Sequence, residues 1–515
     1  MVFFDNETRE SIEKLISEHG DTDYDSLISE KGYYHFYHLS SLRHALMDWY
    51  PFEKGTALEI GPGYGGLTGL YLKKIGAVDV AETDSGMCES LKNRFGDKRI
   101  GIYQTDIFGL DAGKRYDYVF FVDESSLYSG NIENELSEIK KHLKENGTAV
   151  IGFRNKDGIK YSCGALDEYV TSPQQTNSLV DKKEFDDAAR NRFKHVKYYY
   201  PFPDHIYTQA VFSDTCPPPE NLRDRVMPLD PFDSPLVKKE IEEYGKAVNE
   251  GHIADCSNFC LAFLSDRAQG EPAVEQAILS YDRKERSVMT VFFSNGTVEK
   301  RAVNENGKEL LKQSFHNLEE LRERGVPVID QRISGDTLVM PWIKADSLQR
   351  RIQRSVAAGD REGLVNVFQS VYETVIKSSE TDKTGYDAER WGIPAECAGT
   401  ILRKGYTDLI PLNAFDTNEG IMFYDQEFVE VFCPARYIMY RAILYSYMNV
   451  PEAEHVIPKR EMYGFFGIDH HTEQALTAVE NRFIEKVRSL ELYRQMYGWA
   501  YCITDERIKK NRKGH

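Results

Sequence analysis

The chain has 515 residues, which is too many for a single hydrophobic core and indicates two or three domains. Hydrophobic residues make up 41% of the chain and the formal net charge at pH 7 is −18, so the composition is that of an acidic globular protein. Nucleic acid binds basic surfaces, so no nucleic-acid partner is expected.

Strand and helix signals alternate from residue 56 to 155, as they do in βαβ units. Apolar and amphipathic runs predict strands at 56–60, 78–84, 99–106, 116–124 and 148–155, with helices at 66–76 and 134–147. Two later runs, 195–203 and 256–265, are expected to be the last strands of the same sheet, and a Pro-rich insertion at 214–256 is interpreted as a lid or spacer. The sequence therefore predicts a Rossmann-like α/β domain over residues 1–268, with helices on both faces of the sheet.

A glycine-rich turn connects the first predicted strand to the first predicted helix. Its sequence, LEIGPGYGGLT, places Glu59, Gly61, Gly63 and Gly65 in the pattern acid-x-G-x-G-x-G. Glycines at such a turn let the backbone bend sharply and approach a ligand closely. The spacing differs from the G-x-G-x-x-G of dehydrogenases, which places a diphosphate at a helix N-terminus. An acid before the turn suits a ligand with a positively charged end.

This turn and the acids that follow it resemble class I methyltransferases that use S-adenosylmethionine. In that family the glycine turn wraps the amino-acid end and the ribose of the cofactor. An acid after the second strand binds the ribose hydroxyls, which the resemblance assigns to Glu82, with Asp84 as the alternative. An acid after the third strand contacts adenine, and Asp106 has that place. A Rossmann-like fold that binds another nucleotide is the competing interpretation.

The methyl-transfer reaction itself needs few protein groups. Transfer from a sulfonium is an in-line displacement in which the protein aligns the acceptor, and a general base is needed only where the acceptor must lose a proton. The candidates are His38, Asp123, Glu124 and His205, of which we predict His38 and Asp123 as catalytic; each is also compatible with a structural role. The sequence has no Asn-Pro-Pro-Tyr motif for a base or amide nitrogen, which favours an oxygen acceptor.

The character of the sequence changes near residue 270. Short strands separated by tight turns are predicted at 276–282, 287–293 and 297–303, where they would form an antiparallel meander. Long helical segments dominate the remainder of the chain. The sequence therefore predicts a second, α+β domain over residues 270–515, with a small lobe to about 342 and a helical lobe after it.

Spaced polar residues in this second domain suit phosphoryl transfer from ATP. Asp408 and Asn413 have the D-x-x-x-x-N spacing of a catalytic loop, in which the Asp faces the acceptor hydroxyl and the Asn binds magnesium. Asp425 ends a short apolar run and is the expected second magnesium ligand. Lys300 on the third predicted strand is the expected phosphate-binding lysine, and Glu309 its expected partner. These features resemble the bilobal protein-kinase-like fold.

The second domain departs from standard protein kinases at several positions. The sequence GYTDL replaces His-Arg-Asp, DQE replaces Asp-Phe-Gly, and no G-x-G-x-x-G loop precedes Lys300. Such departures are common among small-molecule and sugar kinases of this fold, and they also leave room for an inactive domain. An acidic loop with chance spacing is the structural alternative.

Four further segments extend the resemblance to nearly the whole chain. They cover residues 37–52, 154–169, 198–214 and 425–445. They are similar to a bacterial family that joins a methyltransferase to a kinase-like domain and occurs with genes for surface polysaccharides. The best understood relatives phosphorylate and then methylate the growing end of an O-antigen chain. The resemblance implies a bifunctional enzyme acting on a glycan or glycolipid. A small-molecule methyltransferase with an inactive kinase-like domain and a non-catalytic nucleotide-binding scaffold are the alternatives.

Cysteine usage and hydropathy indicate where the protein works. The eight cysteines include no CxxC pair and no zinc-type spacing with histidine, which suits a reducing cytosol. The sequence shows neither a signal peptide nor an apolar run of membrane-spanning length. We expect a cytoplasmic protein. Association with the inner face of the membrane through partners, and formation of a homo-oligomer, are left open.

Overall fold

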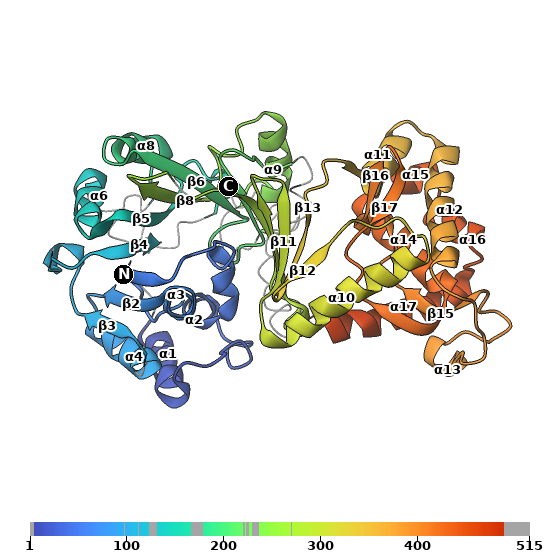
Figure 1. The fold of residues 1–515 in the computed structure, drawn as a ribbon, viewed down its shortest axis with the longest axis horizontal. Coiled ribbons are helices and arrows are strands. Elements are labelled where there is room, and N and C mark those ends of the chain that lie inside the picture. Colours follow the sequence, from blue (N-terminus) through green and yellow to red (C-terminus); the bar gives the residue numbers. More distant parts are fainter. Residues whose placement is uncertain are drawn as a thin grey trace. The chain divides into compact units, whose positions relative to one another are not determined.

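The computed structural model describes residues 5–96, 98–111, 113–122, 131–165, 179–219, 222, 226–228, 236–268 and 270–488. The chain packs as two compact units (Figure 1). The first runs to Asp282 and includes Met289–Asn295, and the second holds Arg283–Val288 and Gly296–Arg488. The sequence placed the boundary between 268 and 270. The packing differs because the strand at 274–280 pairs with a strand of the first unit and so satisfies that strand's exposed backbone groups.

The first unit is built around a mixed sheet with the strand order β3-β2-β1-β4-β5-β8-β6-β7-β9-β10. Its strands are β1 (Gly55–Ile60), β2 (Gly76–Ala81), β3 (Ile100–Tyr103), β4 (Tyr116–Val122), β5 (Leu143–Arg154), β6 (His195–Phe202), β7 (Ala210–Ser213), β8 (Phe259–Ser265), β9 (Val274–Ser280) and β10 (Val288–Phe293). Strands β1 to β5 pair in parallel, and β8 runs antiparallel to both β5 and β6. The carboxyl ends of β1 to β6 therefore lie along one edge of the sheet.

Helices cover both faces of this sheet (Figure 1). Along β4, Val119 and Phe121 join the same core as Leu136, whereas Phe120 between them stacks on Tyr71 with ring centroids 3.8 Å apart. Successive strand residues point to opposite faces, so Leu136 of α6 and Tyr71 of α3 mark the two helical layers. The helices and short 3₁₀ turns are α1 (Asn6–His19), α2 (Tyr33–Leu39), η1 (Ser41–Leu46), α3 (Thr68–Lys74), α4 (Ser85–Phe95), η2 (Ile107–Gly109), α6 (Ile132–Lys141), α7 (Ile159–Ser162), α8 (Lys182–Arg190) and α9 (Glu240–Asn249).

The strands predicted from the sequence of the first unit are confirmed, but one helix is shorter than predicted. The pattern at 134–147 indicated a single helix, whereas α6 ends at Lys141 and β5 already begins at Leu143. Leu143 pairs with Tyr116 of β4, and the polar residues 144–146 that follow are exposed. A segment without apolar residues gives a helix nothing to bury, so strand pairing determines the structure here.

The second unit combines a small antiparallel sheet with a larger helical part. The order β12-β13-β11 joins β11 (Thr297–Ala302), β12 (Arg332–Ser334) and β13 (Thr337–Pro341), and α10 (Glu305–Glu323) follows β11. Short strands follow at β14 (Asp346–Ser347), β15 (Ile401–Tyr406), β16 (Ala414–Thr417), β17 (Gly420–Phe423) and β18 (Val429–Pro434). The helices are α11 (Leu348–Ala357), α12 (Arg361–Lys377), α13 (Ala388–Trp391), α14 (Ala435–Asn449), α15 (Ala453–Val456), α16 (Lys459–Phe465) and α17 (His470–Val487), with the 3₁₀ turns η4 (Lys284–Arg286) and η5 (Pro411–Asn413).

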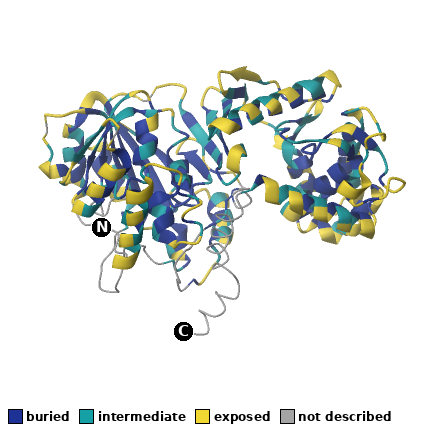
Figure 2. Ribbon diagram, turned by 90° about the horizontal axis from the view of Figure 1, so that it is seen from below, coloured by how far each residue is buried: buried dark blue, intermediate teal, exposed yellow. Residues whose placement is uncertain are grey.

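Each unit has its own hydrophobic core. In Figure 2 the sheet of the first unit is mostly dark blue, the colour of buried residues, and the helical part of the second unit is dark blue in its interior and yellow on its outer faces. In the second unit, α12 and α14 each bury a face of apolar residues in one cluster with the strand pair β15–β18. Within the described ranges, no helix is both long and apolar enough to cross a membrane.

Candidate functional site

The glycine-rich turn lies between the carboxyl end of β1 and the start of α3. Gly61, Gly63 and Gly65 have φ angles of +64°, +57° and +82°, in the left-handed region that favours glycine. The amide of Gly61 donates to the carbonyl of Ala81 at the end of β2, at 2.9 Å. The turn is therefore held at the edge of the sheet where β1 and β2 end side by side.

The second and third glycines of the turn have different surroundings. A Cβ on Gly65 would lie 2.6 Å from Phe95 and 3.0 Å from Leu91, both on α4, so this glycine allows the turn to pack on the helix. A Cβ on Gly63 would lie 3.4 Å from Cε1 of His38, so the predicted catalytic histidine lies directly against the turn. His38 is buried on α2.

Glu82 fixes the turn from the neighbouring strand. Its carboxylate accepts a hydrogen bond from the amide of Gly63 at 3.1 Å and another from the amide of Asp84 at 2.9 Å. Burial raises the pKa of Glu82. Asp84 has a different task, because its carboxylate caps α4 and pairs with Arg9 of α1 at 2.5 Å. This arrangement favours Glu82 over Asp84 as the acid that faces a ligand of the turn.

Glu59 precedes the turn and is directed into the protein. Its Oε2 accepts a hydrogen bond from the hydroxyl of Thr68, on α3, at 2.6 Å. The carboxyl is almost fully buried, and burial raises its pKa to about 7. Glu59 therefore ties the end of β1 to the start of α3. Its structural role is visible, whereas ligand contact by Glu59 stays a prediction.

The raised pKa of Glu59 makes stability depend on pH. Because this pKa lies above the ordinary value of 4.5, the folded chain binds the proton more tightly than the unfolded chain. Its contribution to stability, roughly 3 kcal/mol, is full below pH 4.5 and is lost as the pH rises through about 7. Glu59→Gln should flatten this part of the profile in thermal unfolding followed from pH 5 to 8. Parallel profiles for the two proteins would contradict the assignment.

The end of β3 carries two exposed aromatic residues beside the predicted adenine-binding acid. The Oδ1 of Asp106 accepts from the amides of Phe108 and Gly109, both at 3.0 Å, and so caps η2. Phe108 is 55% exposed and Tyr103 is 38% exposed. The carbonyl of Tyr103 accepts from the amide of Glu82 at 3.0 Å, which places Tyr103 at the edge that holds the glycine turn. The exposure of the two aromatic residues was not predictable from the sequence, because it depends on the folded edge of the sheet.

The N-terminal helices close over the glycine turn. Tyr64, within the turn, is fully buried in a cluster with Ile12, Ile16, Tyr24, Ile28, Leu39 and Met87. Its hydroxyl donates to Glu13 at 3.1 Å, and Arg9 pairs with Glu13 at 2.9 Å. Sequence patterns gave no signal for this cap, because it depends on contacts between residues far apart in the chain.

The remaining predicted residues of the first unit lie at the same edge or outside the described residues. Asp123 and Glu124 belong to the segment that the structure does not describe. His205 is buried after β6 and stacks on Phe259, with ring centroids 4.3 Å apart. Its carbonyl accepts a hydrogen bond from Arg43 of η1. His205 thus packs as a core residue, and a catalytic role stays a prediction.

A buried polar cluster beside His205 was not foreseen from the sequence. Lys160 of α7 pairs with Asp204 at 3.2 Å, and both side chains are almost completely buried. Asn258 donates to Glu240 of α9 at 2.5 Å, and Tyr244 donates to the same carboxylate. Burial raises the pKa of Glu240 to about 7. The cluster anchors the described part of the 214–256 insertion at the carboxyl edge of the sheet.

Comparison with known proteins identifies the fold of the first unit. Residues 40–154 match the family model of the ribosomal RNA adenine dimethylases. A curated relative, the ribosomal RNA small subunit methyltransferase A of Mycoplasma capricolum subsp. capricolum, is 39% identical over 64 residues, which are 12% of this chain and 24% of that protein. The chain thus spans about a quarter of the length of the curated relative that it matches.

Several solved methyltransferase structures are also similar over part of the chain. They include StiE O-MT (14% identity, 44% of this chain and 74% of that chain, TM-score 0.27), a putative O-methyltransferase from Nostoc punctiforme PCC 73102 (15%, 31% and 52%, 0.24) and the N-methyltransferase NodS from Bradyrhizobium japonicum WM9 (18%, 22% and 66%, 0.21). The identification rests on the family model together with the strand order β3-β2-β1-β4-β5-β8-β6, with β8 antiparallel. The first unit has the class I S-adenosylmethionine-dependent methyltransferase fold.

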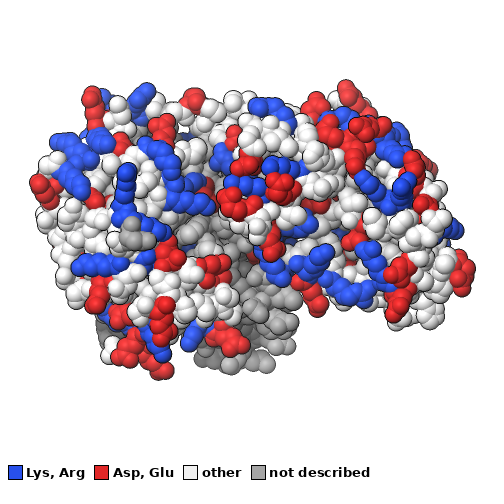
Figure 3. Space-filling model, turned by 60° about the horizontal axis from the view of Figure 1, so that its bottom comes forward, with Lys and Arg blue, Asp and Glu red and all other residues white. Residues whose placement is uncertain are grey.

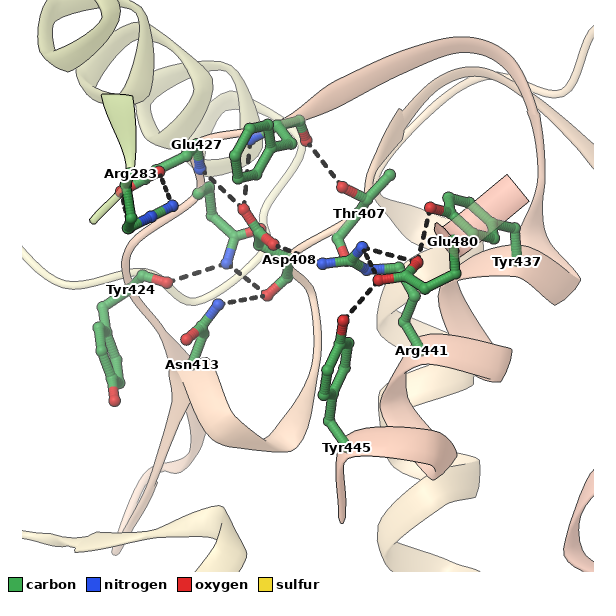
Figure 4. A network of polar contacts seen from close by, with 12 residues as sticks. Arg283, Thr407, Asp408, Asn413, Tyr424, Glu427, Tyr437, Arg441, Tyr445 and Glu480 are labelled. Atoms are coloured by element: carbon green, nitrogen blue, oxygen red, sulfur yellow. Dashed lines mark hydrogen bonds and ion pairs between the residues drawn. The ribbon is translucent and has the colours of Figure 1, made fainter. Parts of the chain in front are cut away.

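A second polar site lies in the second unit, around Lys300. Lys300 of β11 is buried and pairs with Asp425 and, at 2.8 Å, with Glu427. Burial alone would lower the pKa of Lys300, but the two carboxylates raise it above its ordinary value. Arg283 binds the other oxygen of Glu427 at 2.7 Å (Figure 4). Asp425 has a φ angle of +56°, and such strain in a non-glycine residue is often found at functional sites.

Asp408 lies next to this group and is also buried. Its Oδ2 accepts from the amides of Glu427 and Phe428, at 3.1 and 3.3 Å (Figure 4). Burial raises its pKa to about 6, and Arg441, 3.4 Å from Oδ1, acts in the opposite direction. Arg441 is held by Glu480 of α17 at 2.8 Å. This supporting pair was not predicted from the sequence, because α14 and α17 meet only in the folded chain.

The structure brings together most of the residues predicted for phosphoryl transfer. The side chain of Asn413 donates to the carbonyl of Asp408 at 3.3 Å. The carbonyl of Asn413 accepts from the amide of Tyr424, the residue before Asp425, at 2.9 Å. Among the described residues, no three His, Cys, Asp or Glu side chains are arranged to hold a metal. Magnesium binding by Asn413 and Asp425 therefore stays a prediction.

The pairing predicted between Lys300 and Glu309 is not formed. Glu309 is exposed on α10 and pairs with Lys312 at 2.6 Å. Glu427 lies beside Lys300, where Glu309 was expected. The physical reason is the helix register: Ser314 and Asn317 occupy the buried face of α10, and Asn317 donates to the carbonyl of Gln426 at 2.9 Å.

Proposed function

We propose that the first unit transfers a methyl group from S-adenosylmethionine to an oxygen of a surface-glycan or glycolipid precursor. The observation that carries the cofactor assignment is the hydrogen bond from Gly63 to Glu82, which sets an acid beside a turn of left-handed glycines. Such a turn accommodates the ribose and the positively charged amino-acid end of this cofactor. The cofactor supplies an activated methyl group, and the chain supplies alignment.

Each group at this edge has a separate task in the proposed site. Glu82 is placed to accept hydrogen bonds from the ribose hydroxyls, and the aromatic rings of Tyr103 and Phe108 are placed to contact the adenine. The Asp106 carboxylate, which caps η2, has an oxygen besides Oδ1 available for the amino group of the base. His38, against Gly63, is the proposed general base for a hydroxyl acceptor.

A glycan or other small acceptor suits the surface better than a nucleic acid does. On the face drawn in Figure 3, blue basic and red acidic side chains are interspersed, and the described residues there form no continuous basic area. The net charge of the chain is −18. Nucleic-acid binding depends on basic surface, so we propose a small or glycan acceptor reached in the cytoplasm.

Removing the carboxylate of Glu82 tests the cofactor assignment. Glu82→Ala should weaken binding of S-adenosylhomocysteine by about 10- to 100-fold, because a hydrogen bond to a charged group contributes roughly 1.5–3 kcal/mol. Calorimetric titration measures this difference. Glu53→Ala, which removes an exposed glutamate of the same unit, is the matched control and should bind as the unaltered protein does. Equal affinities in all three proteins would contradict the role of Glu82.

A second candidate activity, phosphoryl transfer from ATP, is favoured by the group around Lys300. One lysine, one strained aspartate and a buried second aspartate meet with Asn413 in the second unit. We propose that Lys300 binds phosphate groups, that Asn413 and Asp425 hold magnesium, and that Asp408 faces the acceptor hydroxyl. The acceptor of this step would be the same glycan or glycolipid that the first unit methylates.

A further inference from the structure

A short basic turn lies where protein kinases have a glycine-rich loop. In those enzymes the loop precedes the strand with the phosphate-binding lysine, and its backbone covers the phosphates. Here residues 281–287 read YDRKERS and contain no glycine. They contribute Arg283, Lys284 and Arg286, the last two within η4. We call residues 283–286 the basic turn.

The basic turn is fixed against the start of α10. Asn304, which caps that helix, donates from its side chain to the carbonyl of Lys284 at 2.9 Å. A Cβ on Gly307 would lie only 2.5 Å from the carbonyl oxygen of Glu285, so a glycine is needed for this approach. Lys284 has a φ angle of +53°, a strained conformation for a residue with a side chain. The turn therefore has a defined shape that its surroundings enforce.

Arg283 reaches from this turn to the carboxylate that also holds Lys300. Its Nη2 lies 2.7 Å from one oxygen of Glu427, and Nζ of Lys300 lies 2.8 Å from the other. Two cations thus face the same carboxylate. The side chain of Arg283 is 20% exposed, compared with 6% for Lys300, so Arg283 is the less buried of the two cations.

Arg286 provides a second guanidinium on the same turn. It lies over the ring of Phe428, 4.3 Å from the centroid, and is half-buried. The amide of Phe428 donates to Asp408, the residue proposed to face the acceptor. Stacking on an aromatic ring orients a guanidinium while leaving its N–H groups in plane for an anion. The basic turn therefore places one arginine beside Lys300 and the other beside the catalytic loop.

The charges of this group leave a place for an anion. Lys300 shares its charge between Asp425 and Glu427. When Asp425 serves as a magnesium ligand, as proposed above, Glu427 remains as the carboxylate between Lys300 and Arg283. Arg283 and Lys300 then share one carboxylate, and Arg286 adds a third positive charge, whereas the nearby Asp408 is paired with Arg441. The phosphate groups of a nucleotide supply the balancing negative charge, and arginine binds phosphate through paired hydrogen bonds.

We propose that Arg283 and Arg286 bind the phosphate groups of a nucleoside triphosphate together with Lys300, in place of the backbone amides of a glycine-rich loop. This inference rests on the phosphoryl-transfer function proposed for the second unit. It assigns phosphate binding to two residues that no kinase motif contains.

The test is the binding of magnesium-ATP and of adenosine to the full chain and to arginine variants. Arg283→Gln and Arg286→Gln should each weaken magnesium-ATP binding by about 10- to 100-fold in calorimetry, because each removes charge-assisted hydrogen bonds. Binding of adenosine, followed by ligand-observed NMR with the first unit saturated by S-adenosylhomocysteine, should stay unchanged because adenosine has no phosphate. Arg301→Gln is the matched control: Arg301 is next to Lys300 in sequence, pairs with Glu299, and its loss should leave both ligands unaffected.

The outcomes separate this inference from the function on which it rests. If the unaltered chain binds magnesium-ATP and both arginine variants bind it equally well, the basic turn does not hold phosphate, while the proposed phosphoryl transfer stands. If the unaltered chain binds no magnesium-ATP at millimolar concentration, the function and the inference both fall. If Arg283→Gln lowers the melting temperature, two other variants take its place: Arg283→Lys, which retains the charge at Glu427, and Arg286→Gln. Magnesium-ATP binding by both that equals binding by the unaltered chain would overturn the inference.

Discussion

Replacing Gly63 with valine is expected to abolish binding of S-adenosylhomocysteine while the chain remains folded. The φ angle of Gly63 is +57°, and a β-branched residue is strongly disfavoured there. Its Cβ would also lie in van der Waals contact with His38, 3.4 Å from Cε1, which leaves little room for the two methyl groups of valine. Because the Gly63 amide donates to Glu82, any movement of the turn also displaces the proposed ribose-binding carboxylate. We expect affinity in calorimetry to fall by at least about a hundredfold, a change of roughly 2.7 kcal/mol or more.

A matched variant separates this local effect from general strain. Gly251 also has a left-handed φ, of +76°, but a Cβ there would meet no atom within 4 Å. Gly251→Val should therefore carry a similar backbone strain and leave the affinity unchanged. A folded Gly63→Val protein that binds as tightly as the Gly251→Val control would show that the turn does not contact the cofactor.

Replacing Asp408 with asparagine is expected to stop phosphoryl transfer and retain binding of magnesium-ATP. The amide preserves the shape of the carboxylate but cannot accept the proton of the acceptor hydroxyl. Loss of such a base typically costs 10²- to 10⁴-fold in rate, which formation of ADP from ATP would report. In the unaltered protein the rate should rise with pH through about 6, the raised pKa of Asp408, because the base acts when deprotonated.

The control for this variant is a second aspartate-to-asparagine change in the same unit. Asp416 of β16 is partly exposed and lies 3.5 Å from Arg351, away from the buried group around Lys300. Asp416→Asn should leave both ATP binding and turnover unchanged. Turnover that persists in Asp408→Asn would remove Asp408 from the reaction, and the second unit would then be a nucleotide-binding companion to the first.

Features with a local cause were predictable from the sequence. The strands of the first sheet follow from short apolar runs, and the turn at Gly61 to Gly65 follows from glycines that need left-handed φ angles. The resemblance to class I methyltransferases pointed to Glu82 because it directly follows the second strand. Its carboxylate lies beside the turn, since neighbouring parallel strands end at the same edge, and ribose binding stays a prediction.

Features that depend on distant contacts could not be predicted in this way. Glu309 and Glu427 are both acids that follow Lys300 in the chain, and only the register of α10 decides that Glu427 pairs with it. The Arg441–Glu480 pair behind Asp408 joins two helices that sequence spacing does not relate. The strand β9 was expected in a second domain, but it pairs with β7 of the first unit, a tertiary contact that local sequence does not determine. The partners of polar residues were therefore harder to predict than the residues themselves.

The central claim is that the first unit binds S-adenosylmethionine at the Gly63–Glu82 edge of its sheet. The most direct measurement is calorimetric titration of the full chain with S-adenosylhomocysteine, repeated with the Glu82→Ala variant. The structure predicts saturable binding of one molecule per chain, weakened about 10- to 100-fold in the variant. Absence of binding to the folded chain, or equal binding by both proteins, would contradict it.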